Sequence, residues 1–286
     1  LYLQNDYKVT SKLTLAVGQR YEYETPLIER FDRTVTQFDF SVVSPIDAEA
    51  RARYAANPIP AVPVEQFRAR GGLLFAGAGG RPRAFWEGDK NNFMPRFGIA
   101  YAIRPTTVIR TGYGIFFDIL GSKHQAIQSG FSQSTPVVAS LDNGLSFIAS
   151  LADPFPTGLL PAQGPAGGFA TNLGQSVSFF PARMINSYAQ RWSFGLQHQF
   201  LREFVIDASY VGNRGTKLAA NREFNPVPAP YLSTLPYRDQ PTIDFLTAQV
   251  RNPFAGLLPG TGLNGTTVSQ SQLLRPYPQF GSISSP

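Results

Sequence analysis

The chain has 286 residues, a formal net charge of +6 and no cysteine, which excludes disulfides and thiolate metal sites. Charged residues make up only 15%, below the ~25% of soluble domains, and aromatic residues reach 13%. The 26 glycines and 24 prolines disfavour long helices. The basic residues are scattered, and we therefore expect no nucleic-acid partner. This composition indicates an aromatic-rich β protein with long loops.

The first stretch alternates between apolar and polar side chains, which predicts a strand pair over about 1–24 with a turn at Thr10-Ser11. Arg20 and Glu22 lie on its polar side. The opening residues have none of the features of a signal peptide, so we expect the chain to start within a larger protein.

Short elements are expected in the long connections. Ser44-Pro45-Ile46-Asp47 predicts the start of a helix that ends at Asn57-Pro58. Residues 63–72 and 266–276 predict two further short helices, and 72–77 predicts a short strand.

A second strand pair is predicted over about 93–118, on either side of a turn at Arg104-Pro105. Its polar side combines Arg96 and Arg110 with glycine and alanine. Its apolar side consists of Phe97, Ile99, Tyr101, Ile109, Tyr113, Ile115 and Phe117.

A third pair is predicted over about 188–212, joined by Leu201-Arg202-Glu203. Arg191 and Asp207 lie on its polar side. The apolar side contains Trp192, Phe194, Leu196, Ile206 and Tyr210.

Long connections separate the pairs, at 25–92, 119–187 and 213–278. Of the prolines, only Pro95 and Pro105 fall within the strand pairs, as expected because proline cannot donate to a strand ladder. Connections of this length are rare in compact soluble domains.

The character of the polar face distinguishes a soluble sandwich from a membrane sheet. A sandwich would expose lysine, glutamate and threonine, whereas these strands place arginine, glycine and glutamine there. Tyrosine and tryptophan near the strand ends match the aromatic girdles of outer-membrane barrels, and so do short turns alternating with long loops. The pattern predicts an antiparallel transmembrane β-barrel segment: an incomplete barrel, open and curved, with long extracellular loops containing short helices. The apolar residues named above would face lipid, and the six charged ones would face the lumen.

Five blocks of the sequence resemble the barrel of TonB-dependent receptors, most closely the Oar-like subgroup. They are KVTSKLTLAVGQRYEYETP (8–26), DKNNFMPRFGIAYAI with TVIRTGYGIFFD (89–118), QRWSFGLQHQF (190–200), SYVGNRGTKL (209–218) and LLRPYPQFGSI (273–283). The resemblance extends over essentially the whole chain.

This resemblance implies active transport across the outer membrane. In that family a large substrate binds the extracellular loops and the plug, and TonB pulls on the plug to open the lumen. The chain shows no plug and no TonB box, and six strands cannot close the ~22-stranded barrel of such transporters. We therefore expect a barrel segment whose partners are lipid, an unknown extracellular substrate, and a plug domain and TonB acting through other parts of the protein. The alternatives are a surface adhesion or interaction protein, a passive porin-like barrel, and a soluble carbohydrate-binding β domain.

No catalytic, cofactor or metal site is expected. His198 has no metal-binding spacing to a second histidine, and packing near a strand end is the simpler interpretation. The six lumen-facing charges would hydrogen-bond a plug, guide a ligand or simply be hydrated. Loop aromatics such as Phe155, Tyr231 and Phe254 would either contact substrate or pack within the loops.

Overall fold

The computed structural model describes residues 1–135, 137–140, 144–201 and 203–286. The chain forms two compact units, each assembled from three segments that alternate along the sequence. Unit 1 contains Leu1–Leu27, Trp86–Gln125 and Arg183–Ala220. Unit 2 contains Ile28–Phe85, Ala126–Ala182 and Asn221–Pro286.

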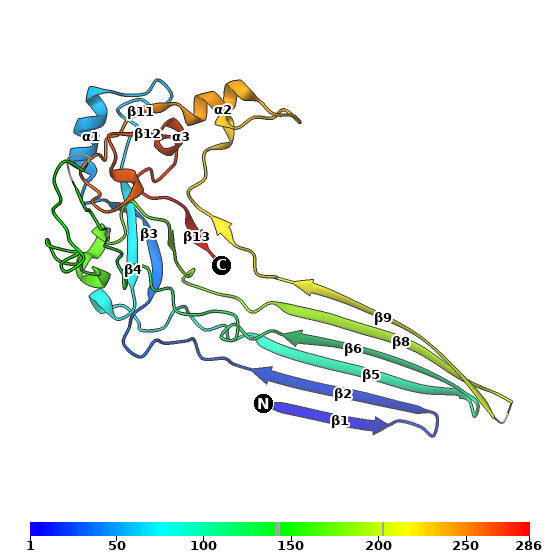
Figure 1. Cartoon of the computed structure of the whole chain (residues 1–286). Helices are drawn as coiled ribbons and strands as arrows, with labels where there is room; N and C mark the ends of the chain where they lie inside the picture. The colour runs from blue at the N-terminus through cyan, green and yellow to red at the C-terminus, as the bar shows by residue number, and fades with distance from the viewer. Residues whose placement is uncertain (136, 141–143, 202) are drawn as a thin grey trace. The chain divides into compact units, whose positions relative to one another are not determined.

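Unit 1 is a six-stranded antiparallel sheet in the order β1-β2-β5-β6-β8-β9 (Figure 1). Its strands occupy the three stretches where alternation predicts strand pairs, although the last strand continues past 212. The strands are β1 (Tyr2–Lys8), β2 (Leu13–Glu22), β5 (Asn92–Arg104), β6 (Thr107–Phe117), β8 (Tyr188–Phe200) and β9 (Phe204–Thr216). The sheet is open, with β1 and β9 at its edges.

The register between neighbouring strands keeps side chains of one kind on one side of the sheet. Leu15 pairs with Ile99, Ile99 with Thr111, Thr111 with Phe194, and Phe194 with Tyr210. The residues that alternate with these along each strand lie on the opposite face of the sheet. On that face Gly114 is the cross-strand partner of both Arg96 and Arg191. Within the sheet, the one register shift is in the β5–β6 pair, between Ala102 and Arg104, beside the turn.

Short turns join the strands of each pair. Between β1 and β2, the hydroxyl of Thr10 accepts hydrogen bonds from the backbone N–H groups of Lys12 (3.1 Å) and Leu13 (3.0 Å). Two residues, Pro105 and Thr106, separate β5 from β6. Of the predicted connection between β8 and β9, Arg202 lies outside the described residues.

Unit 2 is built from the long connections and contains small sheets and short helices. The sheets are β3 (Val35–Val43) with β4 (Arg70–Phe75), β11 (Gln249–Arg251) with β12 (Thr267–Ser269), and β10 (Arg222–Glu223), β13 (Ile283–Ser285) and β7 (Val177–Ser178). The helices are α1 (Asp47–Ala56), α2 (Gln240–Thr247) and α3 (Gln270–Leu273), with 3-10 turns at Ala78–Gly80, Gly164–Ala170, Ala229–Tyr231 and Gly262–Asn264. Among the described residues, no helix is both long and apolar enough to cross a bilayer.

The structure confirms some of the short helices and strands that the sequence predicts in the long connections. Helix α1 ends with Asn57 at its C-cap, as predicted, but begins at Asp47, with Ile46 and not Ser44 at its N-cap. Strand β4 overlaps the predicted 72–77 but spans Arg70–Phe75, and α3 is a single turn within 266–276. The helix predicted over 63–72 is wrong, because this stretch makes a turn at Pro63–Phe67 and then enters β4. Gly71, with φ +94°, has a backbone conformation that an α-helix cannot contain. Strand β3 and helix α2 were not predicted.

An aromatic-rich core holds unit 2 together. Tyr54 stacks on Phe67 with ring centroids 4.0 Å apart, and Phe38 packs against Phe280 at 5.5 Å. Phe254 is completely buried in this core, and the half-buried Tyr231 donates its hydroxyl hydrogen to the Ala61 carbonyl oxygen (3.0 Å). The long connections are therefore packed, and two of the three loop aromatics singled out from the sequence stabilise that packing.

A buried asparagine organises the last segment of unit 2. Asn225 has no exposed surface, and its side-chain nitrogen donates to the carbonyl oxygens of Tyr277 (3.0 Å), Phe280 (3.3 Å) and Gly281 (2.7 Å). Its side-chain oxygen accepts from the Tyr277 N–H (2.9 Å). One side chain thus bonds four backbone groups of the LLRPYPQFGSI segment, which has little regular secondary structure of its own. Gln272 donates two more hydrogen bonds, to the carbonyl oxygens of Pro278 (2.8 Å) and Phe280 (2.6 Å).

Replacing this asparagine should destabilise unit 2. Asn225→Ala leaves the Gly281 carbonyl oxygen and the Tyr277 N–H without their hydrogen-bond partner in a buried site. It also removes one of the two hydrogen bonds at the Tyr277 and Phe280 carbonyl oxygens, and the total cost should be about 3 kcal/mol. The loss is measured as a decrease in the free energy of unfolding by denaturant titration. Asn221→Ala is the matched control, because Asn221 is exposed in the same unit, and it should change stability little. Equal effects of the two substitutions would contradict the assigned role.

Candidate functional site: a two-faced sheet and an amide-lined pocket

One face of the six-stranded sheet is apolar and uncovered. All twelve residues predicted to face lipid lie on it, as the strand register requires. Phe97 is 53% exposed, Phe194 51% and Ile206 59%, so no second layer from the described residues packs over this face. An apolar surface of this extent needs an apolar environment.

Some polar side chains on the apolar face are hydrogen-bonded within the sheet. The Thr111 hydroxyl, in the middle of the face, donates to the Ser193 carbonyl oxygen (2.9 Å). His198 lies near the turn end, with its Nδ1 atom 2.9 Å from the Thr107 hydroxyl oxygen. Such internal hydrogen bonds reduce the cost of placing these groups in an apolar environment.

The opposite face brings the six predicted polar residues together on one side of the sheet. Arg20 and Glu22 form an ion pair along β2. Arg110 donates to the side-chain oxygen of Gln197 (2.7 Å), which is the cross-strand partner of Asp207. An open hollow of about 250 Å³ is lined by Arg110, Gln197, Asp207 and Ser209, among others.

Two arginines on this face flank a glycine. Arg96 and Arg191 are both cross-strand partners of Gly114 in β6. The Arg96 guanidinium lies 4.8 Å from the centroid of the Phe116 ring, a cation–π contact. A Cβ atom added at Gly114 would lie 3.0 Å from that ring and 3.5 Å from the Arg96 side chain. Glycine therefore makes room for the neighbouring side chains of the sheet.

The polar face has the groups of a hydrated, weakly cationic wall. Within the part of the chain that the structure describes, neither Arg96 nor Arg191 forms an ion pair. No three carboxylate or histidine side chains among the described residues are close enough to hold a metal ion. The arrangement suits the hydration or attraction of anionic and polar groups.

Carboxylates organise the ends of the strands where the long connections begin. Glu24, just after β2, accepts hydrogen bonds from the N–H groups of Leu120 (2.9 Å) and Gly121 (2.7 Å). Asp118, just after β6, forms an ion pair with Lys123 and accepts from the Ile119 N–H (2.9 Å). The hydrogen bond from Lys123 is the main cause that lowers the pKa of Asp118 below its ordinary value.

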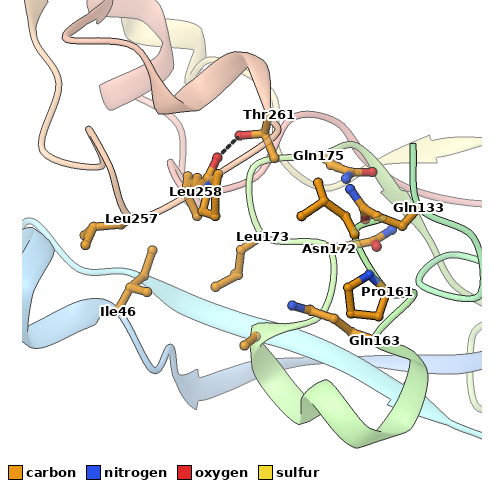
Figure 2. Close-up of a pocket in the computed structure, with 13 residues that line it drawn as sticks. Ile46, Gln133, Pro161, Gln163, Asn172, Leu173, Gln175, Leu257, Leu258 and Thr261 are labelled. Carbon is orange, nitrogen blue, oxygen red and sulfur yellow. Dashed lines mark hydrogen bonds between the residues drawn. The ribbon is translucent and has the colours of Figure 1, made fainter. Parts of the chain in front are cut away.

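Unit 2 contains a pocket of about 320 Å³, which we call the amide-lined pocket. Figure 2 shows an apolar part, which includes Ile46, Leu257 and Leu258, and an amide part formed by Gln133, Asn172 and Gln175. The remaining lining residues are Leu160, Pro161, Gln163, Ala170, Leu173, Pro259 and Thr261. The Thr261 hydroxyl donates to the Leu258 carbonyl oxygen (2.9 Å), and no charged or aromatic side chain is among the described residues that line the pocket.

Sequence reasoning did not find this pocket. Its residues come from separate stretches of the chain, at 46, 133, 160–175 and 257–261. Glutamine, asparagine and leucine are common residue types, and they follow no motif spacing here. The contacts of unit 2 bring them together, and no local signal in the sequence could have done so.

Comparison with known families agrees with the two-faced sheet. A family model described as an outer membrane beta barrel domain matches residues 1–285. No curated protein and no solved structure matches the chain.

Adjacent residues of β8 test which face contacts lipid. Phe194→Arg places a charge on the apolar face near the middle of the strand and should cost about 2–4 kcal/mol of folding free energy in a bilayer. Ser193→Arg, on the polar face, should cost far less, because its guanidinium can be hydrated. Reversible urea unfolding of the full-length protein in lipid vesicles measures both. A larger cost for Ser193→Arg would reverse the assignment of the faces.

The Asp118–Lys123 pair should respond to acid. Because the pKa of Asp118 is lowered in the folded protein, its stabilising effect is complete above about pH 4 and is lost as the pH falls through the folded-state pKa. The pair is partly exposed, so its contribution is below about 1 kcal/mol. Lys123→Gln should raise the Asp118 pKa, as followed by carboxyl carbon NMR. Lys90→Gln, in the same unit, should leave it unchanged, and an unchanged pKa in Lys123→Gln would contradict the pairing.

Proposed function

Because this chain belongs to the outer membrane beta barrel domain family, we propose that it is part of the barrel of an Oar-like TonB-dependent receptor. In this proposal the protein takes part in energised uptake of a large extracellular substrate through a plugged barrel. Family membership places the protein in the outer membrane. The transport mechanism and the subgroup rest on the arguments that follow.

The two-faced sheet is the observation that best supports the proposal. Its central strands, such as β5 with 13 residues and β6 with 11, reach the ~9–11 residues that a tilted strand needs to cross a bilayer. The apolar face is continuous across all six strands, and the opposite face combines arginine with glycine and hydroxyl groups. Lipid on the first side and an aqueous lumen on the second account for both faces.

Open sheet edges support a barrel larger than the six strands. The edge strands β1 and β9 have backbone groups without a neighbouring strand on one side. In a bilayer such groups must be paired, because no water reaches them. We infer that further strands of the same protein close the barrel, as in the wide barrels that accommodate a plug.

The long connections support binding of a large substrate over simple diffusion. They form a packed unit with its own core and an open pocket, and such a structure is more than is needed to link strands. The five sequence blocks that resemble Oar-like receptors extend into this unit through LLRPYPQFGSI. The polar arginines, Arg20, Arg96, Arg110 and Arg191, are suited to contact a plug domain.

A substrate-independent experiment tests the proposal. The full-length protein, purified from outer membranes and reconstituted in a planar bilayer, should conduct little current, because a plug fills the lumen. In cells, photo-crosslinking should join the protein to TonB. Deletion of the plug-encoding segment should abolish the crosslink and open the pore. A steady, large conductance of the intact protein without a TonB crosslink would identify a passive barrel, and a closed barrel without a crosslink would favour a surface interaction protein.

A further inference from the structure

The amide-lined pocket has a chemistry that restricts its ligand. None of its described lining residues is charged, so none of them would compensate the desolvation of an ionised ligand group. The same described residues include no aromatic ring, on whose negative face the C–H groups of a sugar would pack. What it offers is primary amides beside aliphatic side chains.

The amides are available to a ligand. Across the residues that the structure describes, no hydrogen bond engages the side chains of Gln163, Asn172 or Gln175, and Gln133 makes only a long one, to the Ser134 carbonyl oxygen (3.3 Å). Each primary amide has both donors and an acceptor. A peptide group has the same combination, so amide and peptide group can satisfy each other.

The backbone holds Asn172 in a fixed position. Asn172 has φ +58°, a left-handed conformation that asparagine adopts more readily than most residues. The next residue, Leu173, is buried in the core, and the Gly174 N–H donates to the Gln279 carbonyl oxygen (2.8 Å). The side chain of Asn172 is therefore presented from an anchored turn, which lowers the entropy cost of binding.

The apolar part is suited to one aliphatic side chain. Figure 2 places Ile46, Leu257 and Leu258 apart from the cluster of Gln133, Asn172 and Gln175. A volume of about 320 Å³ is at the lower end of the ~300–1,000 Å³ of ligand pockets, so the pocket takes a small part of a large substrate.

We propose that the amide-lined pocket binds an uncharged peptide segment. An aliphatic side chain enters the apolar part, and the adjoining peptide groups bond to Asn172, Gln175 and Gln133. This inference gives the substrate class of the proposed receptor and therefore rests on the proposed uptake function. Binding of the peptide does not itself require TonB or another energy source.

The test uses the full-length protein in detergent micelles and the capped tripeptide acetyl-Ala-Leu-Ala-amide as probe, with saturation-transfer NMR as the readout. Acetyl-Ala-Asp-Ala-amide, acetyl-Ala-Lys-Ala-amide and maltose are the comparison ligands. The leucine peptide should bind, and the other three ligands should bind at least about tenfold more weakly. The aspartate and lysine peptides place a charge in an uncharged pocket, and maltose has no aliphatic side chain for the apolar part.

Two variants locate the binding. Asn172→Asp combined with Gln175→Glu keeps the side-chain shapes but replaces donors by charge, and it should weaken binding of the leucine peptide about tenfold or more. Ala170→Leu should reduce the volume of the pocket that Ala170 lines and have a similar effect, with thermal unfolding checked to be unchanged. Gln66→Glu, an exposed amide elsewhere in unit 2, is the matched control and should bind as the unchanged protein does.

The outcomes separate this inference from the proposed function. Absence of leucine-peptide binding, equal binding of maltose or the charged peptides, or unaltered binding by the Asn172/Gln175 variant would overturn the peptide site. None of these results depends on TonB. Conversely, a missing TonB crosslink would overturn the transport proposal while leaving measured peptide binding intact.

Discussion

The strand register of the antiparallel sheet is the constraint on which the rest of the structure depends. Side chains alternate between faces along every strand, so a slip of one residue in any pair would move apolar residues to the polar face. From β1 to β9 the partners preserve this alternation through the length of the sheet, with the one shift confined to a turn. The ladder also pairs the backbone polar groups, which is obligatory in the outer membrane where this family resides.

Glycine contributes to this register on both faces. At Gly114 the missing side chain leaves space for Arg96 and Phe116. At Gly212, on the apolar face, a Cβ atom would lie 2.4 Å from the indole of its partner Trp192, so the ring lies directly over the glycine. At both positions a large side chain packs over the glycine backbone. These contacts replace those that a side chain at the glycine position would have made.

Two surfaces with different chemistry result from the two units. The polar face of the sheet offers guanidinium, hydroxyl and carboxylate groups in an open hollow, which suits water and exposed polar groups. The amide-lined pocket offers neutral hydrogen-bonding groups beside aliphatic ones, which suits an uncharged ligand. A receptor that recognises part of a substrate and then lets it pass a hydrated wall would need both kinds of surface.

The sequence by itself determined the six strands, their pairing within each hairpin and the face of every predicted residue from Phe97 to Tyr210, because alternation with a period of two is a local property that the ladder preserves. It also predicted the presence and the end of α1, whereas the expected N-cap at Ser44 is wrong because the helix begins at Asp47. Only the tertiary structure decided that the long connections pack around Phe254 and Asn225, and that residues 63–72 form a turn and part of β4 instead of the expected helix. It also decided that Asn172 and Leu258 line the same pocket. Those outcomes depend on contacts between residues far apart in the chain, and such contacts leave no periodic trace in the sequence.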